Sequence, residues 1–323
     1  MLSLKKNVFA AVQPSGTITI GNYYGAIKKW VELQDKFNCS FSVADFHSLS
    51  IRQTPKIFNQ NILRTCACLI ACGLSPQKST LFVQSDVAAH AELSQIINCH
   101  LEFDELFNLD QFRFIKSNYA QNLVNSAIFT YPSLMAADIL LYNTNLVPVG
   151  EDQRQHVELA KIIAKRFNKM YGKIFTSPEP LVPKTGSQIM SLQNPSKKMS
   201  KSDKNELSRI SIFDDENTIT SKFSSAFLDS PDGKLSKDAL NNLAQIYFCA
   251  TGKKIQMEKD HKIFKKIIAK AVYEDLKPIQ ENFSVLIKNE DRIKKCYKEG
   301  SDKAKITAEK TLKTVKEKLG FIS

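Results

Sequence analysis

Short apolar runs alternate with segments of helical periodicity along the first half of the chain. Four compact apolar runs are typical of strands, at residues 8–12, 40–46, 81–84 and 146–149. Helical patterns are expected to begin near Asn22, at Pro55 behind the cap residue Thr54, and near Asp152. Strands that alternate with helices through short connections predict a parallel sheet with helices on both faces, a Rossmann-like α/β fold.

The second half of the chain has a different pattern. After Pro195 the strand-like runs disappear, and lysine-rich amphipathic segments follow at about 238–251, 262–276, 279–299 and 303–319. We therefore expect a Rossmann-like domain over residues 1–204 and an all-helical domain over residues 205–323. Residues 88–142 are mainly helical in pattern and exceed the length of one crossover, which predicts an insertion in the first domain.

Composition narrows the class of protein. Of the 323 residues, 43% are hydrophobic and 24% are charged, which is typical of a globular protein and excludes a disordered or fibrous chain. No apolar run reaches the roughly 18–20 residues of a membrane span, and the first residues lack the apolar segment of a secretory signal. We therefore expect a cytoplasmic protein with no membrane association. The seven cysteines form no C-x-x-C pair, which argues against a disulfide framework and a structural zinc site.

Positive charge is concentrated in the helical half. The formal net charge is +12, and from residue 197 onward 27 Lys and Arg stand against 19 Asp and Glu. An uneven positive excess is typical of proteins that bind nucleic acid or another polyanion. A solvated basic surface explains the same charge balance equally well.

The loops that follow the expected strands are candidates for chemistry. Parallel sheets bind ligands beyond the carboxyl ends of their strands, which points to the loops after Val12, Phe46 and Val149. The first of them, the glycine loop, reads Gln13-Pro14-Ser15-Gly16-Thr17-Ile18-Thr19-Ile20-Gly21-Asn22. Backbone N–H groups at such a helix start favour phosphate, and Thr19 and Asn22 add neutral donors. Many α/β turns look similar and bind nothing, so this motif alone is of moderate specificity.

A second motif, the lysine loop, lies near the expected domain boundary and reads Lys198-Met199-Ser200-Lys201-Ser202. Two cations three residues apart, with hydroxyls beside them, suit a polyphosphate whose charge shifts during a reaction. A solvated basic run could have the same sequence, so this motif alone also leaves two interpretations open.

The two motifs together resemble the paired signature of the class I aminoacyl-tRNA synthetases. Thr19-Ile20-Gly21-Asn22 corresponds to the H-I-G-H element, and the lysine loop to the K-M-S-K-S element. Residues 130–142 and 147–153, with Gln155-His156, extend the resemblance to the bacterial-type tryptophanyl-tRNA synthetases over essentially the whole chain. The resemblance implies activation of L-tryptophan by ATP, followed by its transfer to the 3′ end of tRNA(Trp).

The resemblance also implies which residues contact ATP. Lys198 and Lys201, with Mg²⁺, would stabilise the departing pyrophosphate, and Thr19 and Gln13 would complete the catalytic set. The further ATP-binding residues implied by the family are Pro14, Ser15, Gly21, Asn22, Gly150, Glu151, Asp152, Ile189, Met199, Ser200 and Ser202. Glu151 could instead be an acidic residue that complements the dipole of the following helix. No residue of the chain is expected to ligate a metal ion.

A pocket for the amino acid is arguable from the residues themselves. Tyr131, Met135, Asp138 and Tyr142 fall on one face of a helix that Pro132 can start. An unpaired carboxylate in such an apolar run is costly, so Asp138 either accepts the single N–H of an indole or pairs with a buried Lys or Arg. The resemblance favours the indole. It adds three more tryptophan-binding residues, Gln153, His47 and Phe9, although His47 could equally be structural and Phe9 could be a core residue.

The family resemblance implies partners as well. A homodimer would form through residues 88–142, and residues 205–323 would bind the anticodon end of the tRNA. A tyrosyl-tRNA synthetase is the nearest alternative function, followed by a small-metabolite nucleotidyltransferase and by a synthetase-like RNA-binding protein without catalysis. Met135 with Asp138 favours tryptophan, the helical domain argues against a nucleotidyltransferase, and the intact lysine loop argues against a non-catalytic protein.

Three positions depart from the family pattern near the expected ATP contacts. Gln188 stands where Arg is common, Arg113 where Lys is common, and Leu228 where Thr is common. Arg113 would preserve a positive charge for the phosphates, although Arg and Lys are not interchangeable.

Overall fold

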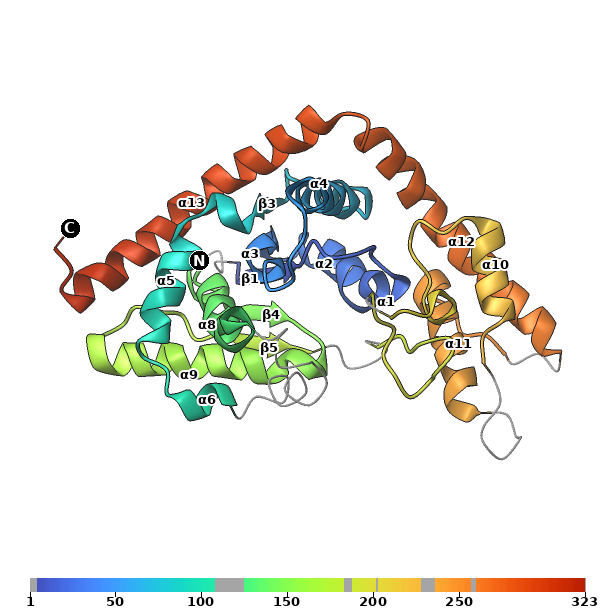
Figure 1. Ribbon diagram of the computed structural model, residues 1–323, viewed down its shortest axis with the longest axis horizontal. Helices are drawn as coiled ribbons and strands as arrows, with labels where there is room; N and C mark the ends of the chain where they lie inside the picture. The colour runs from blue at the N-terminus through green and yellow to red at the C-terminus, as the bar shows by residue number, and fades with distance from the viewer. Residues whose placement is uncertain are drawn as a thin grey trace.

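The computed structural model describes residues 5–107, 125–182, 188–201, 203–227, 236–256 and 260–322, apart from the side chains of Phe107 and Asp152. Within these residues the centre of the molecule is a parallel sheet in the order β3-β2-β1-β4-β5 (Figure 1). The strands are β1 (Asn7–Val12), β2 (Asn38–Val43), β3 (Ser79–Val83), β4 (Leu146–Pro148) and β5 (Glu179–Leu181). The predicted parallel α/β sheet is confirmed, and β5 is the one strand that was not predicted.

Helices and the loops that connect them make up the rest of the described chain. Those of the first half are α1 (Ile20–Asn22), the π-helical turn η1 (Tyr23–Ile27), α2 (Lys28–Leu33), α3 (Asp45–Ser48), α4 (Pro55–Ala71), α5 (Ala89–Asn98), α6 (Phe103–Phe107), α8 (Ser126–Leu140) and α9 (Arg154–Tyr171). Those of the second half are α10 (Glu216–Ser224), α11 (Lys237–Thr251), α12 (His261–Leu286) and α13 (Glu290–Leu319). Short 3₁₀ turns are η2 (Gln84–Asp86), η4 (Glu151–Gln153) and η5 (Glu206–Ser208).

The helix predicted to begin at Pro55 does so. Thr54 caps α4 by accepting a hydrogen bond from the Ile57 backbone N–H at 3.4 Å, and Pro55 occupies the first turn, where its missing N–H is not needed. Gly73 follows the helix with φ of +107°, a conformation that L side chains rarely adopt. Local sequence signals therefore define both ends of this element.

The helix predicted near Asn22 is present, but its cap residue is Thr19, and the helix start expected at Pro132 is wrong. The first helix begins at Ile20 with Thr19 as its cap, because Thr19 and Asn22 form a capping box in which each side chain bonds the other residue's backbone N–H. Helix α8 begins at Ser126, and Pro132 lies inside it. Packing of α8 against α5 and α9 outweighs the backbone hydrogen bond that a proline inside a helix loses.

The second half is helical as predicted, but α13 is continuous where a break was expected near residue 300. At Gly300 this helix approaches β3 closely, which glycine permits because a Cβ atom there would lie 1.7 Å from the Leu81 backbone oxygen. Helix α13 therefore runs alongside β3 and α5 of the first half (Figure 1). The domain boundary after residue 204 stays a prediction. Within the described ranges, no helix has the length and apolar character that a bilayer crossing requires.

One apolar core joins the sheet to the helical half. Its buried members include Val8 and Phe41 from the sheet, Met199 from the lysine loop, and Ile246 and Phe264 from α11 and α12. The lysine loop is thus anchored in the same core as the strand that leads into the glycine loop.

Candidate active site

The glycine loop follows β1 at the carboxyl ends of the strands, as the sequence predicted. Thr19 is 1% exposed, and its N–H donates to Asn22 Oδ1 at 3.1 Å. The capping box therefore commits both residues to holding the turn. Gln13 and Gly16, on the other side of the loop, are exposed to solvent.

The glycine loop and the lysine loop lie against each other. Lys201 Nζ donates to the Gln13 backbone oxygen at 3.3 Å. A Cβ atom on Gly21 would lie 3.3 Å from Met199 Cβ, so glycine permits this close approach. Burial lowers the pKa of Lys201 to about 8. Two motifs from distant parts of the sequence thus form one site, as the paired signature implies.

The lysine loop extends from a short antiparallel hairpin. The Met199 N–H donates to Ile189 O at 2.9 Å, and the Ser191 N–H donates to Lys197 O at 2.8 Å. The side chains of Ile189 and Met199 are 1% and 3% exposed, so a contact from either residue to ATP would use the main chain. Lys198 and Ser200 are exposed on either side of the buried methionine.

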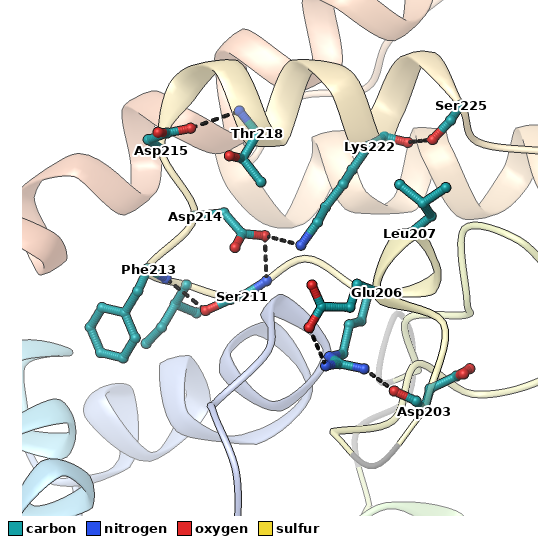
Figure 2. Close-up of polar contacts among 12 residues, drawn as sticks. Asp203, Glu206, Leu207, Ser211, Phe213, Asp214, Asp215, Thr218, Lys222 and Ser225 are labelled. Carbon is teal, nitrogen blue, oxygen red and sulfur yellow. Dashed lines mark hydrogen bonds and ion pairs between the residues drawn. The ribbon is translucent and has the colours of Figure 1, made fainter.

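The segment after the lysine loop pairs with the glycine loop. The Ile20 N–H donates to Ile210 O at 2.9 Å, and the Ile212 N–H donates to Ile18 O at 3.1 Å. Figure 2 shows how this segment is braced: Lys222 reaches from α10 to Asp214, which also accepts from the Ser211 backbone. The Lys222 Nζ–Asp214 Oδ2 distance is 2.6 Å, and the Ser211 N–Asp214 Oδ2 distance is 2.9 Å.

Further along this brace, Arg209 donates to Asp203 O and pairs with Glu206 (Figure 2 labels both acidic residues). The chain between the lysine loop and α10 is therefore tied both to itself and to the glycine loop. The helical half thus contributes main-chain groups that hold the first motif in place.

Asp138 is the centre of a buried hydrogen-bond cluster. It is 2% exposed and accepts from Gln84 Nε2 at 2.7 Å, from His90 Nδ1 at 2.6 Å and from His47 Nε2 at 2.9 Å. Burial alone would raise the pKa of Asp138, but hydrogen bonds from His47 and His90 and the charge of the imidazoles lower it to about 2. The carboxylate is therefore ionised at neutral pH. Within the described residues its partners are two imidazoles and an amide, not the Lys or Arg considered as the alternative.

Gln84 and His90 were not predicted as site residues. His90 is fully buried, and its Nε2 lies 2.7 Å from the Tyr142 hydroxyl, so a relay runs from Asp138 through His90 to Tyr142. Phe9 stacks on Tyr142 with ring centroids 5.5 Å apart. Gln84 directly follows β3, so applying the rule about carboxyl ends to the third strand as well would have found it.

A cavity of about 200 Å³ adjoins this cluster. It is lined by His47 and Tyr131 together with Phe46, Ala91, Ser94, Gln95, Asn98, Ala127, Thr130 and Leu134. Small-molecule pockets usually measure about 300–1,000 Å³, so this cavity suits a single side chain and not a nucleotide. The Tyr131 hydroxyl contacts His156 Nε2, and burial raises the pKa of Tyr131. Met135 is half-buried against the core next to α5.

The remaining predicted residues occupy varied positions. Glu151 is exposed and pairs with Arg154 at 3.0 Å, which matches the alternative role of an acidic residue at a helix start. Pro14 is buried, whereas Ser15, Gly150 and Gln153 are half-buried around the glycine loop and η4. The predictions for Ser202, Arg113 and Leu228, and for the Asp152 side chain, lie outside the described residues. In the described part of the chain, no three His, Cys, Asp or Glu side chains gather where they could hold a metal ion.

Comparisons with known sequences agree with this geometry. A family model described as class I tRNA synthetases (W and Y) matches residues 5–281. The tryptophan–tRNA ligase of Clostridium tetani is 43% identical over 327 residues, covering 98% of this chain and 96% of the relative. That of Halalkalibacterium halodurans is 45% identical over 329 residues, covering 98% of each.

Solved structures give the same result. The tryptophanyl-tRNA synthetase of Mycoplasma pneumoniae superposes with a TM-score of 0.87 at 29% identity, covering 99% of both chains. That of Campylobacter jejuni, complexed with ADP and tryptophan, has a TM-score of 0.79 at 30% identity, covering 98% of this chain and all of the other. The fold predicted from the sequence is therefore confirmed over nearly its full length.

Proposed function

The chain belongs to the class I tRNA synthetases that serve tryptophan and tyrosine, and we propose that the Asp138 cluster selects its amino acid while the paired loops activate it. Its reaction is that of a tryptophan–tRNA ligase, which uses ATP to join L-tryptophan to tRNA(Trp). The observation that carries the proposal is the contact of Lys201 with Gln13, which brings the two loops together beyond the strands. Asp138 is tied to the same end of the sheet by Gln84 and His47, which follow β3 and β2.

In the first step, the tryptophan carboxylate attacks the α-phosphorus of ATP, and pyrophosphate leaves. A carboxylate is already a nucleophile at neutral pH, so catalysis consists of positioning and of stabilising charge that moves onto the leaving group. Lys201, which the Gln13 contact holds against the glycine loop, and Lys198 beside it supply positive charge. Gln13, Ser15 and Gly21 would line the opposite side of the phosphates, on the turn that Thr19 and Asn22 hold.

Mg²⁺ fits this site as a companion of ATP. Magnesium prefers oxygen ligands and commonly binds through substrate phosphates and water. The described residues offer no cluster of three ligands, so phosphate oxygens would hold the ion. When bound, it supplies further positive charge to the pyrophosphate.

Selection of tryptophan follows from the acceptor capacity of Asp138. A carboxylate has about four lone-pair sites, of which Gln84 and His90 use two on Oδ1 and His47 uses one on Oδ2. One site on Oδ2 remains, and His47, which bonds this oxygen, lines the cavity. A single N–H donor such as indole satisfies it, whereas a phenylalanine side chain would leave it unpaired.

The amino-acid backbone and the tRNA complete the proposed complex. Tyr131 and Gln153 would contact the ammonium group of tryptophan, with Met135 and Phe9 as pocket wall. A ribose hydroxyl of the terminal tRNA adenosine would then attack the adenylate, while the lysine-rich helices grip the anticodon end through phosphates. We also propose a cytosolic homodimer with residues 88–142 at its interface.

Exchange of labelled pyrophosphate into ATP tests the proposed function. We expect exchange that depends on L-tryptophan, with L-tyrosine as the control amino acid. Exchange that depends on tyrosine would overturn the selection of tryptophan, and absence of exchange with both would overturn the assignment of the loops to ATP.

A further inference from the structure

The hairpin that carries the lysine loop has one arm turned toward the helical half. Met190 and Lys198 face each other across the hairpin, and the hydrogen bonds that join the two arms lie on either side of this pair. In such a pair the backbone N–H and C=O groups point away from the partner strand. The main chain of Met190 therefore needs partners outside the hairpin.

Asn242 of α11 supplies both partners. Its Oδ1 accepts from the Met190 N–H at 2.9 Å, and its Nδ2 donates to the Met190 C=O at 3.0 Å. The side-chain amide of Asn242 thus makes the two backbone hydrogen bonds that a neighbouring strand would make. Asn242 is 6% exposed, so water does not compete for these two bonds.

The arm that contains Met190, residues 189–192, is also fixed at Leu192. The Leu192 N–H donates to Ser208 O at 2.9 Å, and Leu192 O accepts from the Phe227 N–H at 2.8 Å. The first arm is therefore attached to the helical half at two successive points. The second arm, with the two lysines, is bonded to the first, and the buried Met199 and the Lys201–Gln13 contact hold it as well.

We propose that Asn242 is a positioning residue for the lysine loop, which fixes the hairpin so that Lys198 and Lys201 lie at the phosphates of ATP. This inference rests on the proposed function of the loop. Asn242 acts only through the main chain of Met190, so its loss affects the ATP step and leaves the tryptophan pocket intact. A displacement of about 1 Å in catalytic groups can cost about 10²-fold in rate.

Two substitutions at this position test the role. Asn242→Ala removes both hydrogen bonds, whereas Asn242→Asp keeps an acceptor for the Met190 N–H and loses the donor to the C=O. Asn241→Ala and Asn241→Asp are matched controls, because Asn241 is the exposed neighbour on the same helix. We expect Asn242→Ala to lower kcat for tryptophan-dependent pyrophosphate exchange about 100-fold, with Asn242→Asp intermediate. Tryptophan affinity, measured by equilibrium dialysis, and the controls should match the wild type.

A purely structural role would give a different result. Parallel losses of Tm, tryptophan affinity and kcat in Asn242→Asp would overturn the proposal, and so would an Asn242→Ala variant as active as Asn241→Ala. Combining Asn242→Ala with Lys201→Ala should cost little beyond Lys201→Ala alone, whereas fully multiplicative losses would contradict action through the loop. A wild-type chain without tryptophan-dependent exchange would instead refute the proposed function itself.

Discussion

The amino-acid pocket and the lysine loop are held in different ways. Asp138 is buried and accepts hydrogen bonds from three separate elements, so its carboxylate is positioned and ionised before any ligand arrives. Lys198 and Lys201 lie on a loop whose anchors are main-chain hydrogen bonds, the buried Met199 and the side-chain amide of Asn242. On the proposed roles, selection of the substrate depends on buried side chains, whereas the chemical step depends on how a surface loop is anchored. Substitutions in the pocket should change affinity, and substitutions in the loop should change rate.

Lys201→Ala should separate the effect on rate from the effect on tryptophan binding most clearly. Removing a cation that stabilises the leaving group should lower kcat for pyrophosphate exchange about 10³-fold and leave tryptophan binding unchanged. Exchange kinetics and equilibrium dialysis measure the two quantities. Lys204→Ala, at a nearby exposed lysine, is the control. Equal losses of rate and tryptophan affinity would contradict the claim that the lysine loop affects only the rate.

Asp138→Asn should produce the reverse pattern. The loss of a charge-assisted hydrogen bond of about 1.5–3 kcal/mol should raise KM for tryptophan about 10- to 100-fold, while KM for ATP stays near its wild-type value. Asp35→Asn removes a carboxylate that is 59% exposed and serves as the control. An increase confined to KM for ATP would show that Asp138 acts with the lysine loop and not in the recognition of tryptophan.

The pH dependence of ATP use should follow Lys201. Burial lowers the pKa of its ammonium to about 8, so the group is charged below that pH and loses its charge above it. Since kcat/KM reports ionisations of the free enzyme, kcat/KM for ATP should be level below about pH 7, be halved near pH 8 and fall to about a tenth of its plateau by about pH 9. Lys201→Arg stays charged throughout, so its profile should lose this decline; an unchanged profile would assign the ionisation elsewhere.

Gln84→Leu should have the smallest effect. It removes one of three donors to Asp138 and leaves the two imidazoles, so we expect KM for tryptophan to rise about fivefold, corresponding to about 1 kcal/mol. Gln77→Leu, at an exposed glutamine, controls for the change in side-chain type. A defect as large as that of Asp138→Asn would show that Gln84 contacts the substrate and does more than orient the carboxylate.

Local signals in the sequence predicted a large part of the fold. The cap Thr54 with Pro55 defines α4, and the compact run at residues 8–12 defines β1. The short strand β5 contains Pro180 and lacks a β-branched residue, so its sequence carries no strand signal. The continuity of α13 through Gly300 was also missed, because it depends on a contact with Leu81 more than 200 residues away.

The candidate site shows the same limit. Sequence reasoning pointed to Asp138 because a lone carboxylate in an apolar helix is conspicuous, and it pointed to both loops because their motifs are specific as a pair. It missed Gln84, although its place directly after β3 was a signal, and it missed His90 and Asn242, whose contacts join distant elements and follow from no local pattern. The identity of a buried acidic residue is therefore easier to predict than the set of partners that keeps it charged.

Helix α13 has a consequence for the solution behaviour of the whole molecule. In the described sheet β3 ends the strand order, so one side of its backbone has no neighbouring strand. Such a backbone is a template for pairing with other chains and for aggregation, yet Gly300 brings α13 directly against it. The last helix thus covers this strand edge and hinders the formation of intermolecular sheets. A chain that ends before Glu290 should aggregate, even though every residue assigned to catalysis is still present.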